Sequence, residues 1–277
     1  MIIDLHSHTS HSDGELTSRG LVERAAGRGV THLAVTDHDT VAGLAKAIAA
    51  GGEFGVCVVP GIEITAHFHG REVHILGHFI APDSAALTAW SRDRLQERTE
   101  RMRLMVERLQ QAGVKVSWDD VQAEAGGESL GRPHLARALV RLGYVDTFQR
   151  AFTRYLSKGG AGYAERPTPA VADVCQLIRA AGGIASVAHP GANKISRAEL
   201  RTLAELGLDA VETAHPEHPP SQESAYLRWA GELGLHSTGG SDFHGDKTGG
   251  ALPGTHITSP ASYDALRQLA DGRRAVG

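Results

Sequence analysis

Residues 4–13 read DLHSHTSHSD, and they end or follow a predicted first strand over residues 1–6. Three histidines and two aspartates lie within these ten positions. His6 and His8 are two residues apart, so in an extended chain both side chains leave the same face. Two imidazoles on one face can bind one cation. The stretch therefore indicates a metal site at the end of the first strand.

Short apolar runs alternate with helical patterns along most of the chain. Seven runs are strand candidates, at residues 1–6, 31–39, 56–65, 72–80, 182–190, 208–216 and 235–244. This alternation predicts an α/β fold with a parallel sheet, which could close into a barrel or stay open. Residues 65–68 are expected to pair with the fourth run across a turn at His69 and Gly70.

A long interruption separates the fourth run from the fifth. It begins with an amphipathic helical pattern over residues 84–113, and three shorter helical patterns follow. We therefore predict a barrel formed by residues 1–82 and 167–277. Residues 83–166 are predicted to be an inserted helical cap over one end of this barrel.

Histidines and acids recur where the predicted strands end. In an α/β barrel the carboxyl ends of the strands form one rim, and active sites lie there. A single histidine at such a place is usually structural, but a set spread over more than 200 positions that meets at one rim favours metal binding. The candidate ligands are His6, His8, Asp13, His38, Glu63, His74, His189, Asp242 and His244.

This candidate set is larger than one ion needs, so it predicts two or three divalent ions bridged by carboxylates. Glu63 is the natural bridge, because it is long and comes from a central strand. Mixed imidazole and carboxylate ligands suit zinc, manganese or iron better than magnesium or calcium.

The composition argues against a long nucleic acid or a membrane as a partner. The net charge of −4 provides no basic field for nucleic acid, and aromatic residues at 5% are too few for a long base-stacking platform. No apolar run approaches the length of a membrane span, and the two cysteines favour free thiols in a reducing compartment. We expect a cytoplasmic protein that acts on a small phosphorylated nucleotide or a short oligonucleotide. The oligomeric state stays open, and a monomer is compatible with the sequence.

The chain resembles the PHP superfamily, which is named for polymerase and histidinol phosphatase domains. Its DLHSH, TDHD, AHP and GGSDFH stretches are similar to the four motifs of that superfamily, in the same order. Its PGIEI and VHILGH stretches are similar to those that carry the bridging glutamate and the following histidine. The helical insertion and the GRPHLARALV stretch resemble the TrpH-like branch.

The resemblance implies a distorted seven-stranded, TIM-like (β/α)7 barrel with a helical insertion over its C-terminal rim and a trinuclear metal site. One ion would take His6, His8, Glu63 and Asp242. A second would take Asp13, His38 and His244, and a third would share Glu63 and take His74 and His189. The branch implies a phosphatase for 3′,5′-bisphosphonucleotides such as pAp, which also trims short RNA from its 5′ end with manganese.

For this chemistry we expect a metal-bridging hydroxide as the nucleophile, with His189 or Asp242 handling the proton of the leaving group. Other anionic groups of the substrate need further cations. A helix that begins with arginine makes a good phosphate site, so Arg132 and His134 are candidates. The remaining candidate phosphate-binding residues are Lys158 and His218.

Three other functions stay open at this point. The nearest is a phosphatase for another small phosphomonoester, such as histidinol phosphate. A metal-dependent amidohydrolase uses a similar barrel and similar histidines. A catalytically silent PHP module that only binds is the third.

Overall fold

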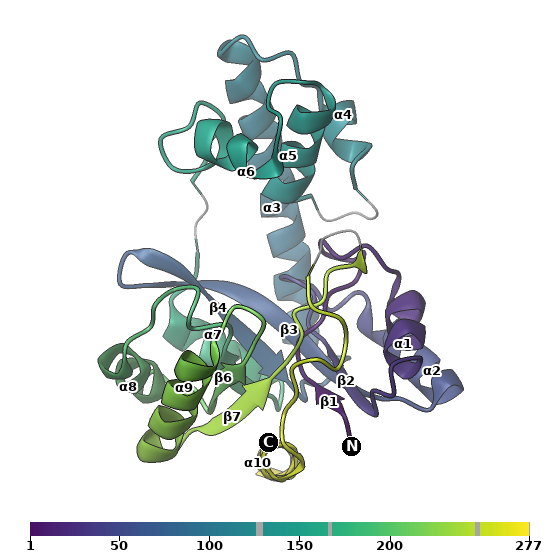
Figure 1. Ribbon diagram of the computed structural model, residues 1–277, viewed down its shortest axis with the longest axis vertical. Helices are drawn as coiled ribbons and strands as arrows, with labels where there is room; N and C mark the ends of the chain where they lie inside the picture. The colour runs from purple at the N-terminus through teal and green to yellow at the C-terminus, as the bar shows by residue number, and fades with distance from the viewer. Residues whose placement is uncertain (126–129, 166–167, 247–249, 277) are drawn as a thin grey trace.

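The computed structural model describes residues 1–125, 130–165, 168–246 and 250–276. Over these residues a single sheet contains seven strands, and each strand pairs with its neighbours in chain order (Figure 1). The strands are β1 (Ile3–Asp4), β2 (His32–Val35), β3 (Cys57–Phe68), β4 (Arg71–His78), β5 (Ile184–Val187), β6 (Ala210–Ala214) and β7 (His236–Gly239).

The sheet closes through the segments that follow its first and last strands. The Asp242 N–H donates to the His6 carbonyl at 2.9 Å, and the His8 N–H donates to the Phe243 carbonyl at 3.0 Å. A Cβ atom on Gly240 would lie 2.4 Å from the His6 nitrogen, so this close approach requires glycine. The result is a nearly closed seven-stranded α/β barrel, as predicted.

One strand departs from the parallel arrangement. β3 and β4 form the predicted hairpin, in which Phe68 pairs with Arg71 and the turn residues His69 and Gly70 both have positive φ. β4 is also antiparallel to β5 on its other side, so the prediction of a parallel sheet is wrong for β4. A hairpin reverses the chain after two turn residues, which leaves no crossover helix to return the strand in parallel.

The hairpin also changes the position of Glu63. β3 runs on to Phe68, so Glu63 lies in the middle of this strand and not at its end. Pairing with β2 stops at Pro60, and a single bridge between His38 and Glu63 follows. Glu63 therefore lies where β3 passes the rim of the barrel.

Helices surround the barrel in Figure 1. They are α1 (Ser18–Ala26), α2 (Leu44–Phe54), α7 (Val171–Ala180), α8 (Arg197–Glu205), α9 (Pro220–Leu233) and α10 (Pro260–Val276). α1 begins where Thr17 accepts a hydrogen bond from the Gly20 N–H, and its Leu21 and Val22 are fully buried in the main core. None of the helices in the described part of the chain is long and apolar enough to cross a membrane.

The interruption forms a helical lobe beyond one end of the barrel (Figure 1). It contains α3 (Ala85–Gln111), α4 (Trp118–Gln122), α5 (Arg132–Arg141), α6 (Phe148–Ala151) and the π-helical turn η1 (Phe152–Leu156). The lobe has a buried apolar cluster of its own, drawn entirely from residues 102–164. The division into a barrel and a cap stays our proposal, and its second boundary, between residues 166 and 167, lies outside the described residues.

Candidate metal centre

The end of β1 places two imidazoles against two carboxylates. His6 and His8 are fully buried, and their Nε2 atoms lie 3.4 and 3.3 Å from Glu63 Oε2. The same two atoms lie 3.2 and 3.1 Å from Asp242 Oδ1. The alternation of an extended chain therefore turns both rings toward one point, as the sequence predicts.

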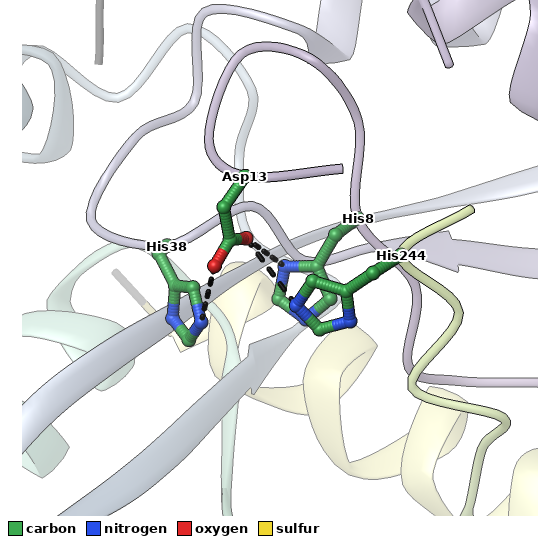
Figure 2. Close-up of side chains that lie close together, drawn as sticks. All are labelled: His8, Asp13, His38 and His244. Atoms are coloured by element: carbon green, nitrogen blue, oxygen red, sulfur yellow. Dashed lines mark ion pairs between the residues drawn. The ribbon is translucent and has the colours of Figure 1, made fainter. Parts of the chain in front are cut away.

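A second group surrounds Asp13 (Figure 2). His244 Nε2 is 3.3 Å and His8 Nδ1 is 3.9 Å from Asp13 Oδ1, while His38 Nε2 is 3.8 Å from Oδ2. The ring of His8 thus faces both groups, one with each nitrogen. The resemblance assigned His8 to the first ion alone, so the ring's second contact is a finding of the structure.

Asp37 holds the loop that carries Asp13. Its Oδ1 accepts hydrogen bonds from the Thr9 N–H and the Ser12 hydroxyl, both at 2.7 Å. Its Oδ2 accepts the Thr9 hydroxyl, also at 2.7 Å. These bonds link the loop after β1 to the segment after β2, which brings Asp13 next to His38.

Glu63 lies at the centre of the whole arrangement. His74 Nδ1 is 2.9 Å and His189 Nε2 is 3.2 Å from Glu63 Oε1, and His38 Nδ1 is 3.0 Å from Oε2. Each carboxylate oxygen therefore faces a different set of imidazoles. This is the geometry expected of a bridging carboxylate.

Buried polar atoms without hydrogen-bond partners show whether this region is suited to metal ions. Buried polar atoms are normally hydrogen-bonded. Among the described residues, several buried atoms here have no hydrogen-bond partner, namely His6 Nε2, His8 Nδ1 and Nε2, Asp13 Oδ1, His38 Nδ1 and Glu63 Oε2. The part of the chain that the structure describes contains five groups of three or four residues whose potential ligand atoms all lie within 4.8 Å of one another. Divalent cations would satisfy these atoms, so the donor set fits a metal centre.

Charges within the centre shift the pKa values of its members. Burial would raise the pKa of Glu63, but His38, His74 and His6 hold it well below its usual range. Burial is likewise outweighed at Asp13, whose pKa is lowered strongly by His244 and His38. The carboxylates therefore stay ionised, as metal ligands must be.

β6 and the residue that follows it place two further side chains against candidate ligands. Glu212 is fully buried; its Oε1 lies 2.9 Å from His6 Nδ1, and its Oε2 accepts the His189 N–H at 2.6 Å. His215 lies just beyond β6, with its Nε2 3.4 Å from Asp242 Oδ2. Glu212 is not among the candidate residues predicted from the sequence. A charged residue inside an otherwise apolar strand, AVETA, was the available signal.

Two of the candidate ligands have a strained backbone conformation. His189 and Asp242 have φ angles of 27° and 50°, in the left-handed region that non-glycine residues rarely adopt. Such conformations persist where the surroundings enforce them, and they concentrate at functional sites.

Two of the four candidate phosphate-binding residues lie beside the centre. Arg132 and His134 line a cavity of about 170 Å³, together with Asp13, His38 and His74. Arg132 lies 3.5 Å from Glu72 at the cavity wall. The His134 ring is buried, and its Nδ1 accepts the Gly131 N–H at 3.0 Å.

The other two lie elsewhere. Lys158 is exposed and is not among the described residues that line the cavity. His218 is buried; its Nδ1 lies 2.8 Å from the Thr213 carbonyl, and its Nε2 accepts the Gly191 N–H at 2.9 Å. Backbone groups thus occupy both ring nitrogens of His218, which leaves neither for a phosphate. His218 holds the loop after β5 instead.

Known proteins resemble this chain over most of its length. The family model of the PHP domain matches residues 4–119. The chain is 35% identical to a 3′,5′-nucleoside bisphosphate phosphatase of Chromobacterium violaceum, over 96% of both chains. The chain belongs to the PHP family. The resemblance noted in the sequence is thereby confirmed.

Other relatives of this PHP protein differ in their named substrates. A 5′-3′ exoribonuclease of Haemophilus influenzae is 36% identical, over 87% of this chain and 89% of the relative. A phosphoribosyl 1,2-cyclic phosphate 1,2-diphosphodiesterase of Eggerthella lenta is 39% identical, over 88% of this chain and 95% of the relative. A solved structure from Bifidobacterium adolescentis, described as a metal-dependent phosphoesterase, superimposes with a TM-score of 0.86 at 35% identity and covers 96% of this chain and 95% of its own.

These relatives share phosphate-ester hydrolysis. The PHP protein described here is accordingly a hydrolytic enzyme, a phosphoesterase that depends on divalent metal ions. The amidohydrolase and the catalytically silent module are not favoured, and neither is histidinol phosphate as the substrate.

Proposed function

We propose that this PHP phosphoesterase removes the 3′-phosphate of 3′,5′-bisphosphonucleotides and releases nucleotides from the 5′ end of short RNA. The observation that carries the proposal is a cluster of buried imidazoles and carboxylates that borders a cavity lined by Arg132. The bisphosphate phosphatase that matches over 96% of both chains supports the same substrate class.

We further propose that two or three metal ions, manganese before zinc or iron, bind at the ligand sets given above. When bound, divalent ions lower the pKa of water and neutralise charge on phosphate oxygens. The central position of Glu63 supports a shared ligand, because its two oxygens face separate imidazoles. The double contact of His8 supports a compact cluster.

The remaining side chains would bind and orient the substrate. Arg132 can hold a second phosphate by paired hydrogen bonds, since a guanidinium matches a phosphate in shape and charge. His189 and Asp242 stay the candidates for protonating the leaving oxygen. The buried Nδ1 of His189 has no hydrogen-bond partner among the described residues, which supports a role in which that atom carries a proton.

A substrate panel tests the proposal. Phosphate or nucleotide release is measured with added manganese on pAp, a 5′-phosphorylated short RNA, a ribose cyclic phosphate and histidinol phosphate. We expect release from the first two. Turnover of only the cyclic phosphate would favour the diesterase activity named for the Eggerthella lenta relative and would overturn the proposal.

Ligand variants test the residues. Glu63→Ala and His6→Ala are expected to abolish turnover while circular dichroism still reports a folded protein. His67→Ala, at an exposed position of β3, is the matched control and should keep full activity. Full activity in either ligand variant would contradict the assignment.

A further inference from the structure

A second hollow borders the metal centre on the side of α1 and α2. This groove has a volume of about 730 Å³, which is within the usual range for small-molecule sites. Its walls come from the loop after β1 (Ser10 and His11), from α2 (Lys46) and from α3 (Leu95 and Arg98). Nothing in the proposed reaction of a mononucleotide uses it.

The groove and the smaller cavity share two residues. His38 lines both, and its Nδ1 lies 3.0 Å from Glu63 Oε2. Arg98 also lines both, and its Nε donates to Asp39 Oδ2 at 3.0 Å, which fixes the guanidinium between them. A molecule whose phosphate lies at the metal centre can therefore continue past His38 into the groove.

The charges along the groove favour an anion. Arg19 is paired with Glu53, and Arg98 is paired with Asp39. Lys46 has no carboxylate within ion-pair distance among the described residues, and it is exposed on α2. An uncompensated ammonium beside a groove attracts phosphate groups.

Part of the lining of the groove is apolar. It consists of the small residues Ala42, Ala49 and Ala50, together with Leu95 of α3. Apolar walls with a few polar groups are typical of sites for organic ligands. The groove thus offers space for a nucleoside as well as a charge for its phosphate.

We propose that this groove holds the nucleotide that follows the scissile phosphate of an RNA chain, with Lys46 at the next phosphate along. The inference rests on the proposed function. In that reaction water adds to phosphorus and the 3′-oxygen of the first nucleotide leaves with a proton. The products are a 5′-mononucleotide and a shorter RNA that keeps its 5′-phosphate. A 3′-monoester such as pAp has nothing to place in the groove.

Steady-state kinetics on two substrates test this inference. KM and kcat are measured with manganese for pAp and for a 5′-phosphorylated trinucleotide, in the wild type, Lys46→Ala and Lys46→Glu. Lys46→Ala should raise KM for the trinucleotide about tenfold, with a larger rise in Lys46→Glu and unchanged values for pAp. The dependence of log KM for the trinucleotide on log salt should fall by about 0.7 in Lys46→Ala.

Two further variants complete the test. Ala49→Trp fills the groove without changing charge and should weaken only the trinucleotide reaction. Lys115→Ala removes an exposed lysine that lines neither hollow and should change neither substrate.

The outcomes separate this inference from the proposed function. Equal effects of Lys46→Ala on both substrates, or no effect on either, would overturn the groove assignment alone. A wild type that hydrolyses pAp but not the trinucleotide would overturn the groove assignment together with the RNA part of the proposed function. A wild type that hydrolyses neither substrate would overturn the proposed function, and the groove assignment with it.

Discussion

At the scale of single residues, hydrogen bonds decide which atoms face the metal centre. Burial would raise the pKa of Glu212, but His6 and His215 lower it to about 2, so this carboxylate accepts hydrogen bonds. The Nδ1 of His6 must then carry a proton, so Nε2, which faces Glu63 and Asp242, is the nitrogen that would bind a metal ion. His215 accepts the Glu217 N–H at its Nδ1, so its own proton lies on Nε2, toward Asp242.

Glu212→Gln should therefore weaken metal binding by about 10- to 100-fold. An amide has one acceptor oxygen, whereas Glu212 accepts from both the His6 ring and the His189 N–H. Competition with a chromophoric chelator measures the affinity. Glu205→Gln, on the exposed face of α8, is the control. Equal affinities in the wild type and Glu212→Gln would refute the orienting role.

His78 is a buried histidine that makes stability depend on pH. Burial lowers its pKa from the ordinary 6.5 to about 4, and its Nε2 donates to the Leu5 carbonyl at 2.8 Å. Below pH 6.5 the unfolded chain takes up a proton that the folded chain refuses until about pH 4. This contribution to stability is therefore present above pH 6.5 and is lost as the pH falls, by about 3 kcal/mol.

His78→Gln should remove that part of the pH dependence, because glutamine can still donate to the Leu5 carbonyl but does not titrate. Urea unfolding between pH 4.5 and pH 7, with chelator present, measures the free energy of unfolding. The difference in the free energy of unfolding between the wild type and the variant should shrink or reverse toward low pH. Parallel curves for the two proteins would show that His78 is not the titrating group.

At the scale of elements, the β3–β4 hairpin and the α3–η1 lobe shape the site. The hairpin carries Glu63 and His74 past the rim, and the lobe covers the rim with Arg132 and His134. The apolar cluster of the lobe shares no residue with that of the barrel. A substitution in the core of the lobe should therefore lower the stability of the lobe without disturbing the candidate metal ligands.

Leu139→Ala tests this independence. Leu139 is fully buried in the lobe, and removing its side chain should cost about 2–5 kcal/mol of stability. Leu104→Ala, at a side chain of α3 that is 40% exposed, should cost less than about 0.5 kcal/mol. Denaturation followed by tryptophan fluorescence gives the stabilities, and elemental analysis gives the metal content. Loss of bound metal in folded Leu139→Ala would contradict a separate cap.

At the scale of the whole molecule, the metal centre joins segments from both ends of the chain. Its candidate ligands come from the loops and strands around β1, β2, β3, β4, β5 and β7. Within the described part of the chain, the centre also holds buried carboxylate oxygens that have no hydrogen-bond partner. Ions that bind only the folded chain stabilise it by mass action. Bound metal ions should therefore contribute a large part of the free energy of unfolding of this protein.

Chelation should accordingly lower Tm by about 5–10 °C, and manganese should restore it. Scanning calorimetry before and after dialysis against EDTA measures the shift. Calcium, which prefers oxygen ligands, is the control and should not restore Tm. An unchanged Tm after complete removal of metal would contradict a structural contribution from the centre.

Patterns in the sequence were sufficient to predict the α/β class, the helical interruption, and the histidines and acids that the structure brings together. Local patterns were sufficient for this, because strand periodicity and motif spacing depend on near neighbours. His6 and His8 face one point because they are two positions apart in an extended chain.

How these residues contact one another follows from the folding of the whole chain. The antiparallel pairing of β4 with β5, the contact of His8 with Glu63, and the hydrogen bond between His218 and Gly191 all join segments that are separated in the chain. The role of Glu212 follows from its contact with His6, which is 206 positions away in the chain. Periodicity reports which face a side chain occupies, whereas the partner across that face is set by the packing of the closed barrel.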